Sequence, residues 1–207
     1  MPIGAFLEAL ASKRLTPSGG STAAVGGAMG AACCEMVCVH TDGVSVPESS
    51  GADASTPTDS PAPGDLSEAA AELAACRERL LELADEDVAA VGAFDSALEG
   101  DEAARADAEA RLLAVPIRTA EACLVVLECA EVVLAAGNPR ALADGVTGVL
   151  LADGALEAAV YTARTNLGAS ESPAAATERR LSALETDAAA ARRRALAAAD
   201  RASERDG

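Results

Sequence analysis

Apolar residues between Leu66 and Leu98 recur in alternating steps of three and four, which is the spacing of one face of an α-helix. A single carboxylate stands in this stripe, where the pattern requires an apolar side chain. The stripe consists of Leu73, Cys76, Leu80, Leu83, Asp87, Val91 and Phe94. A helix with so long an apolar face is stable only when other helices cover it, so this feature points to a helical bundle.

Composition supports the same fold class. Alanine makes up roughly a quarter of the chain, well above ordinary usage, and only three residues are aromatic. Ala, Leu, Glu and Arg favour helices, whereas a β-sandwich or β-barrel needs aromatic and isoleucine residues that are scarce here. We therefore predict an all-α protein, a compact bundle of about five to six helices with a buried Ala/Gly-rich central helix.

The helical patterns cover six stretches within one domain that spans residues 1–207. They are 3–13, 22–40, 66–98, 101–135, 140–167 and 172–205, the fourth being bent or restarted at Val115–Pro116. Residues 15–21 form a turn, and the 140–167 helix is apolar or small on nearly all sides. Residues 41–65 hold four prolines together with Ser, Thr, Gly and Asp, so we expect a disordered loop there.

Acidic residues outnumber basic ones by 33 to 16, which gives a formal net charge of −17. With no basic block, such a chain is not expected to bind nucleic acid. Lys13 is its one lysine. A large acid excess with almost no lysine is typical of proteins from a salt-saturated cytoplasm, where ions screen the repulsion. A GC-rich genome is the alternative explanation for the Ala, Gly and Arg content, and the acid excess favours the halophile.

All six cysteines lie in apolar helical patterns without a C-x-x-C pair: Cys33, Cys34, Cys38, Cys76, Cys123 and Cys129. We expect reduced core residues in a cytoplasmic protein, since buried cysteine behaves as a small hydrophobe. Cys34, Cys38 and His40 lack a zinc spacing, so no metal site is expected. Residues 1–12 lack the features of a signal peptide, and the 22–40 helix is expected to be too short and too rich in alanine to span a membrane.

Asp87 is the first candidate for chemistry. A buried carboxylate is costly unless it is paired or hydrogen-bonded, and functional sites are where such violations are expected. The alternative is a carboxylate at the end of the stripe that pairs with an arginine. Its neighbours Asp85 and Glu86 point elsewhere, and we expect them to be ordinary solvated acids.

The turn at residues 16–22, Thr-Pro-Ser-Gly-Gly-Ser-Thr, is the second candidate. Glycines just before a helix let backbone N–H groups approach a ligand, and a helix N-terminus favours a negative group. A plain N-cap by Ser21 or Thr22 would explain the same residues.

Polar residues at the two ends of the 140–167 helix form the third candidate. Asp144 lies in its first turn, where a carboxylate also complements the helix dipole, and Asn166 lies near its end. Together with Asn138 they could line a cleft.

Five segments between Ile3 and Leu167 match, in the same order, the signatures of one family. Pro17-Ser18-Gly19-Gly20-Ser21 with its Ala/Gly-rich helix is similar to P-G-G-G-S, and Leu83–Asp87 is similar to L-x-D-x-D. Val115-Pro116, Gly137-Asn138-Pro139 through Asp144, and Arg164–Leu167 follow. In these segments the chain resembles the C-terminal domain of formiminotransferase-cyclodeaminase, a family that includes free-standing methenyltetrahydrofolate cyclohydrolases.

The resemblance implies an all-helical fold, a homodimer and a cleft for a folate substrate, and from the charge and the apolar helix we expect no nucleic-acid or membrane partner. It implies that Asp87 is catalytic, with Asp144 in support, and that no metal or redox cofactor is needed. The residues that it places in the substrate-binding cleft are Pro17, Ser18, Gly19, Gly20, Ser21, Asn138, Arg164 and Asn166.

The activity expected first is hydrolysis of 5,10-methenyltetrahydrofolate to 10-formyltetrahydrofolate. The alternatives are the ammonia-releasing formiminotetrahydrofolate cyclodeaminase and a non-catalytic folate-binding paralogue, whereas a purely structural bundle leaves Asp87 unexplained. Ser18, Ala143 and Thr162 depart from the family pattern, and its basic G-K-K-x-Y stretch is absent. The bases that remain as candidates to hold an anionic substrate tail are Arg14, Arg140 and Arg164.

Overall fold

The computed structural model describes residues 2–41, 65–168 and 174–206, and in these ranges the chain forms six α-helices and one short 3-10 helix. The predicted all-α bundle is confirmed. The predicted loop at 41–65 lies outside the described residues except for its two end positions.

The helix bounds agree with the sequence patterns to within a few residues. The helices are α1 (Ile3–Leu10), α2 (Gly19–Val39), α3 (Leu66–Ala97), α4 (Glu102–Ala136), η1 (Pro139–Ala141), α5 (Leu142–Gly168) and α6 (Ala174–Asp206). One predicted boundary is wrong. Helix α2 begins three residues earlier than expected, because Ser18 caps it and Gly19 to Ser21 belong to its first turn. For the fourth helix a bend or a restart at Val115–Pro116 was expected, and α4 is one continuous helix with Pro116 inside it, which excludes the restart.

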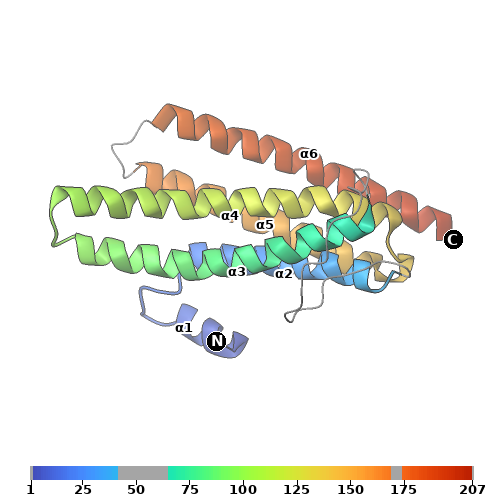
Figure 1. Cartoon of the computed structure of the whole chain (residues 1–207), viewed down its shortest axis with the longest axis horizontal. Coiled ribbons are helices and arrows are strands. Elements are labelled where there is room, and N and C mark those ends of the chain that lie inside the picture. The colour runs from blue at the N-terminus through green and yellow to red at the C-terminus, as the bar shows by residue number, and fades with distance from the viewer. Residues whose placement is uncertain (1, 42–64, 169–173, 207) are drawn as a thin grey trace, which may run out of the picture.

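Four long helices surround the core, and a fifth lies over them. Helices α2, α3, α4 and α5 pack in a closed cycle, each against the next, and α6 runs across α4 and α5 (Figure 1). The fully buried side chains are mostly Leu, Val and Ala, including Leu73, Leu80, Leu127 and Leu156. The many buried alanines between these larger side chains let the helix axes come close together, and this sets the positions of the polar groups at the helix ends.

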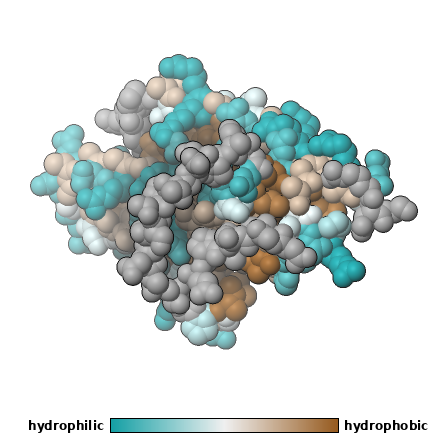
Figure 2. Space-filling model, turned by 45° about the vertical axis from the view of Figure 1, so that its right-hand side comes forward, coloured by the Kyte–Doolittle hydropathy of each residue, from teal (hydrophilic) through white to brown (hydrophobic). Residues whose placement is uncertain are grey.

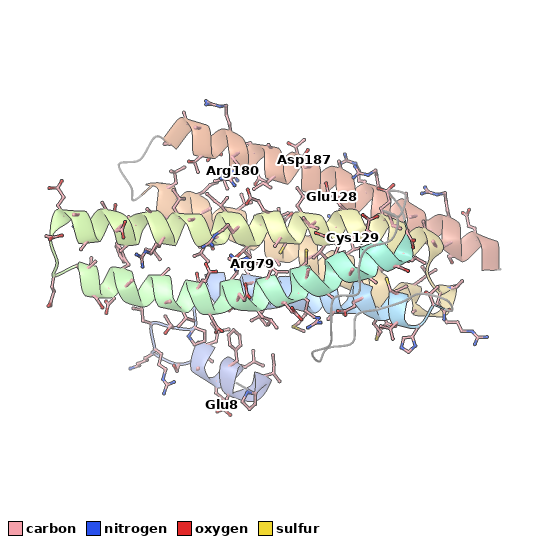
Figure 3. The ribbon with its side chains drawn as sticks, viewed as in Figure 1. Glu8, Arg79, Glu128, Cys129, Arg180 and Asp187 are labelled. Atoms are coloured by element: carbon pink, nitrogen blue, oxygen red, sulfur yellow. The ribbon has the colours of Figure 1, made fainter. Side chains whose placement is uncertain are left out.

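Helix α1 stands apart from this bundle (Figure 1). None of its residues is buried, although Ile3, Phe6, Leu7 and Leu10 form an apolar stripe. Figure 3 places Glu8 on the side of α1 that faces away from the other helices. An amphipathic helix without a buried face gains little stability from its own chain.

Ion pairs attach α6 to the helices beneath it. Arg180 pairs with Glu121 and Arg194 with Glu131, both on α4, and Arg192 lies 3.2 Å from Asp153 on α5. Two of the three consecutive arginines at 192–194 thus pair with acids of the helices beneath. Figure 2 shows one face of the molecule, where hydrophilic side chains stand between smaller hydrophobic areas.

Two stretches have the length and hydropathy of a membrane span, Gly19–Val39 and Pro139–Gly168. The expectation that the first is too short is wrong, because α2 has 21 residues. Of the 18 most apolar consecutive residues in each stretch, half are buried inside the bundle. Apolarity of this degree is what a central bundle helix needs, since its side chains pack against several neighbours at once.

Candidate functional site

Asp87 lies on the inner face of α3 and is 5% exposed. Its Oδ2 accepts two hydrogen bonds from the start of α2: one from the Ser18 hydroxyl at 2.7 Å and one from the Ser21 backbone N–H, also at 2.7 Å. The carboxylate that interrupts the apolar stripe is therefore buried against the predicted turn, and no arginine whose side chain the structure describes pairs with it. Two of the sequence candidates meet at one place in the fold.

The turn owes its shape to a capping box. The Ser18 hydroxyl accepts from the Gly20 N–H at 3.3 Å, and the Ser21 hydroxyl accepts from the Ser18 N–H at 2.8 Å. These bonds satisfy backbone donors that the first turn of a helix leaves free. They also hold the Ser21 N–H so that it points at Asp87.

Gly20 has no room for a side chain. A Cβ built there would overlap Asp87 Oδ1 and lie 2.7 Å from its Cγ. Only glycine lets the backbone of α2 come this close to the carboxylate. Gly19, by contrast, is exposed with open space around its Cα.

The two oxygens of Asp87 differ in their surroundings. Oδ2 has two donors, whereas among the described residues no group donates to Oδ1, which lies over the Cα of Gly20. A carboxylate with one anchored oxygen and one unused acceptor can take a proton from a bound molecule without losing its position. This arrangement is suited to a general base.

Among the described residues, neither Asn166 nor Pro17 hydrogen-bonds to Asp87. Asn166, near the end of α5, donates to the Leu112 carbonyl at 2.8 Å and so links α5 to α4. Pro17 is half-buried just before the cap of α2. Asn166 thus has a structural contact that the sequence did not indicate.

Asn138 and Asp144 lie at the opposite end of α2. Asn138 donates to the His40 carbonyl at 2.7 Å and caps η1, and Asp144 is exposed in the first turn of α5. Asp144 is close enough to Cys33 to contribute to that thiol's raised pKa, after the larger effect of burial. At the rise of an α-helix, Cys33 is about 18 Å and His40 about 28 Å along α2 from Ser21, so Asp144 and Asn138 both lie far from the start of that helix. Within one chain, the structure does not bring Asp144 to Asp87.

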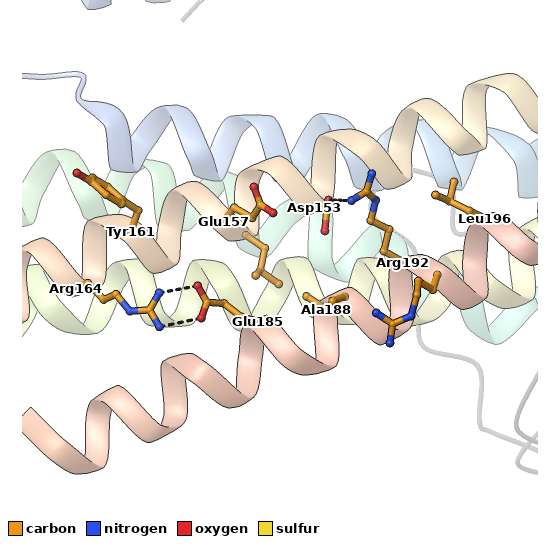
Figure 4. Close-up of a pocket in the computed structure, with 11 residues that line it drawn as sticks. Asp153, Glu157, Tyr161, Arg164, Glu185, Ala188, Arg192 and Leu196 are labelled. Atoms are coloured by element: carbon orange, nitrogen blue, oxygen red, sulfur yellow. Dashed lines mark hydrogen bonds and ion pairs between the residues drawn. The ribbon is translucent and has the colours of Figure 1, made fainter.

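Arg164 is neutralised by two carboxylates, and Figure 4 shows its contact with one of them, Glu185. Its guanidinium lies 2.6 Å from Glu185 and 2.8 Å from Glu178, both on α6. The hydrogen bonds to Glu185 and Glu178 raise the pKa of Arg164. Arg164 and Glu185 line a groove of about 470 Å³ between α5 and α6. Tyr161 and the Asp153–Arg192 pair line the same groove.

Glu86 has partners that the sequence reasoning missed. It lies 2.9 Å from Arg79 on its own helix and 2.6 Å from Arg118 on α4, whereas a solvated acid was expected. Burial, which alone would raise the pKa of Glu86, is outweighed by these two arginines, so the pKa is lowered. Figure 3 marks Arg79 on α3. Arg79 and Glu86 are seven residues apart in the sequence, which places them two helical turns apart on one face of α3. This spacing could have predicted their contact from the sequence.

The cysteines are free, as predicted, with four buried and Cys33 and Cys129 half-buried. In the part of the chain that the structure describes, no group of three or more His, Cys, Asp or Glu side chains could hold a metal ion.

Comparisons with known proteins support the resemblance. Residues 2–185 match the family model described as formiminotransferase-cyclodeaminase. A methenyltetrahydrofolate cyclohydrolase from Methylorubrum extorquens is 32% identical over 187 residues, which cover 86% of this chain and 84% of that protein.

The fold is also found in a solved structure. The crystal structure of formiminotetrahydrofolate cyclodeaminase from Thermotoga maritima has a TM-score of 0.82 to this chain, covering 97% of this chain and 96% of that one at 17% identity. At that identity the likeness shows the fold. With the family match over most of its length, the chain belongs to the formiminotransferase-cyclodeaminase family.

Proposed function

We propose that this chain is a methenyltetrahydrofolate cyclohydrolase of one-carbon metabolism, with Asp87 as its catalytic residue. The observation that carries the proposal is the buried Asp87 carboxylate, which is anchored through Oδ2 at the start of α2 and whose Oδ1 accepts no hydrogen bond from the described residues. The cyclohydrolase relative at 32% identity supports this activity over its alternatives.

The proposed reaction needs one base beside the substrate. 5,10-Methenyltetrahydrofolate carries a cationic amidinium bridge, in which one carbon joins two nitrogens. Water adds to this carbon while Asp87 Oδ1 takes one of its protons, and the π electrons of the C=N bond move to nitrogen. One C–N bond then breaks, the released nitrogen gains a proton and the new hydroxyl loses one. The products are 10-formyltetrahydrofolate and one proton.

We propose that Arg14 is the cationic side chain that binds the anionic glutamate tail of the folate. Arg164 is already paired with two carboxylates, and Arg140 lies in η1, at the other end of α2 from Asp87. Arg14 is exposed four residues before the cap of α2, and no ion pair joins it to another described residue. Lys13 beside it is exposed as well. We expect Arg14→Gln to raise KM with little effect on kcat, and Arg140→Gln to leave both unchanged.

The activity is tested by following the absorbance of methenyltetrahydrofolate with purified protein in molar KCl. We expect turnover by the wild type, and a loss of about 10²- to 10⁴-fold in kcat for Asp87→Asn with the helical fold intact. Asp85→Asn is the matched control, because Asp85 is exposed on the same turn of α3. A wild-type rate in Asp87→Asn would refute the mechanism.

The same preparation separates the alternatives. Ammonia release from formiminotetrahydrofolate without methenyl hydrolysis would make the protein a cyclodeaminase. Folate binding without either reaction would make it a non-catalytic paralogue.

We further propose that the protein is a cytoplasmic homodimer whose contact involves the outer sides of α2 and α5. Glu35, the one charged residue of α2, pairs with Arg77 of α3 at 2.8 Å. Met29 on α2 and Leu150 on α5 are each 49% exposed. In a strongly acidic chain, an uncharged surface is where two copies meet with least repulsion. Light scattering should give a dimer for the wild type and a monomer for Met29→Glu with Leu150→Glu.

A further inference from the structure

We propose that Ser18 is a positioning residue for Asp87: its hydroxyl fixes the plane of the carboxylate so that Oδ1 meets the substrate in one orientation. This inference rests on the proposed function of Asp87. It concerns a residue at which the chain departs from the P-G-G-G-S signature, since the signature has glycine there.

The hydroxyl of Ser18 has one hydrogen, and the structure commits it to Asp87. The Ser18 hydroxyl donates this hydrogen to Asp87 Oδ2 at 2.7 Å. The hydroxyl oxygen of Ser18 itself accepts a hydrogen bond from the Gly20 N–H at 3.3 Å. The backbone of Ser18 is held in turn, because its N–H donates to the Ser21 hydroxyl at 2.8 Å. Ser18 is therefore fixed on both sides before it contacts the carboxylate.

Two donors restrain a carboxylate more than one does. The χ2 torsion of aspartate is broad, so with the Ser21 N–H as its single donor Oδ2 could swing about that one bond, and the plane of the carboxylate would turn with it. Ser18 precedes α2 and Ser21 lies within its first turn, so their donors reach Oδ2 from different directions. With both bonds made, Oδ1 keeps its place over Gly20.

A glycine at position 18 would leave the Ser21 bond as the only restraint on Oδ2 that the described residues provide. Glycine is itself an acceptable N-cap residue, costing helix stability little compared with serine. The Ser18→Gly variant therefore separates the two roles of the hydroxyl, because it keeps an acceptable cap on α2 and removes the hydrogen bond to Asp87. A displacement of about 1 Å in a catalytic group lowers rates by up to about 100-fold.

The test compares kcat and KM for Ser18→Gly and Ser18→Thr under the conditions of the cyclohydrolase assay. We expect Ser18→Gly to lower kcat about 10- to 100-fold with KM within about threefold of wild type. Ser18→Thr keeps a hydroxyl and a good cap, and should restore kcat to within about threefold. Asp101→Ala is the control for capping, because Asp101 caps α4 with a bond to the Ala104 N–H at 2.8 Å. It should lower the melting temperature without changing kcat.

A second readout does not depend on turnover. Crystal structures of the ligand-free wild type and of Ser18→Gly should show one Asp87 carboxylate orientation in the first and several in the second. A wild-type kcat, or a single unchanged Asp87 orientation, in Ser18→Gly would overturn the positioning role. Absence of folate turnover in the wild type would instead refute the proposed function, and the crystallographic comparison would still decide the role of Ser18.

Discussion

At the scale of single residues, Gly20 has the most demanding position in the site. An added Cβ would overlap Asp87 Oδ1, so Gly20→Ala must push the carboxylate from its place. We expect kcat to fall about 100-fold or more. Gly92→Ala is the matched control on α3, where a Cβ meets nothing within 4 Å. It should leave kcat unchanged and stabilise the helix by about 0.5–1 kcal/mol. A Gly20→Ala enzyme with wild-type kcat would contradict this geometry.

The cysteines give a prediction that needs no substrate. Burial, with smaller contributions from neighbouring thiols, raises the pKa of Cys34 and Cys123 to about 12. Because the thiolate is the reactive form, both should resist iodoacetamide at pH 8 in the folded protein. Cys33 is half-buried and should react first. Mass spectrometry of peptides checks the order, and rapid native labelling of Cys34 or Cys123 would contradict it. In denaturant all six should react.

Predictions about single residues were correct where the sequence pattern of one helix was enough to make them. Asp87 breaks the stripe of its own helix, so periodicity alone predicted its burial. The ion pairs of Arg164 and the contact of Asn166 with Leu112 depend on how α4, α5 and α6 come together. No pattern within one helix contains that information, because each pair joins residues on different elements.

At the scale of elements, α2 and α5 touch through their backbones. A Cβ on Gly148 would lie 2.7 Å from both the Gly30 carbonyl oxygen and Cys34 Sγ. We expect Gly148→Ala to cost at least about 2 kcal/mol, since backbone cannot move aside as a side chain can. Gly154→Ala on the same helix meets nothing within 4 Å and should be neutral or stabilising. Urea unfolding measures both variants, and equal stabilities would show that the helices can separate at no cost.

The elements themselves could be predicted because their signals are local. The three-and-four spacing predicted the helices, and the Ala and Gly content predicted a buried central helix. Helix α2 is such a helix, and its Gly30 approaches Gly148 of α5 closely. The start of α2 was placed too late, because glycines usually indicate a turn. Here they belong to the first helical turn, where Ser18 caps the helix and Asp87 fills the space beside Gly20.

At the scale of the whole molecule, two electrostatic effects oppose each other as salt rises. Repulsion among the excess acids, which give a net charge of −17, weakens when the screening length falls from about 10 Å at 0.1 M to about 3 Å at 1 M. The ion pairs that attach α6 to α4 and α5 weaken too, but those at the surface contribute only about 0–1 kcal/mol each. The repulsion involves every acid on the surface, so its relief should prevail.

We therefore expect the melting temperature to rise by at least about 5 °C between 0.1 M and 2 M KCl, which corresponds to a gain of a few kcal/mol for a chain of this length. Sucrose at matched osmolality is the control, because it favours compact states without screening charge. A rise in KCl well above that in sucrose would establish screening as the cause and support the origin in a salt-rich cytoplasm. A melting temperature that stays level or falls in KCl would show that the ion pairs of α6 outweigh the repulsion, and the acid excess would then need another explanation.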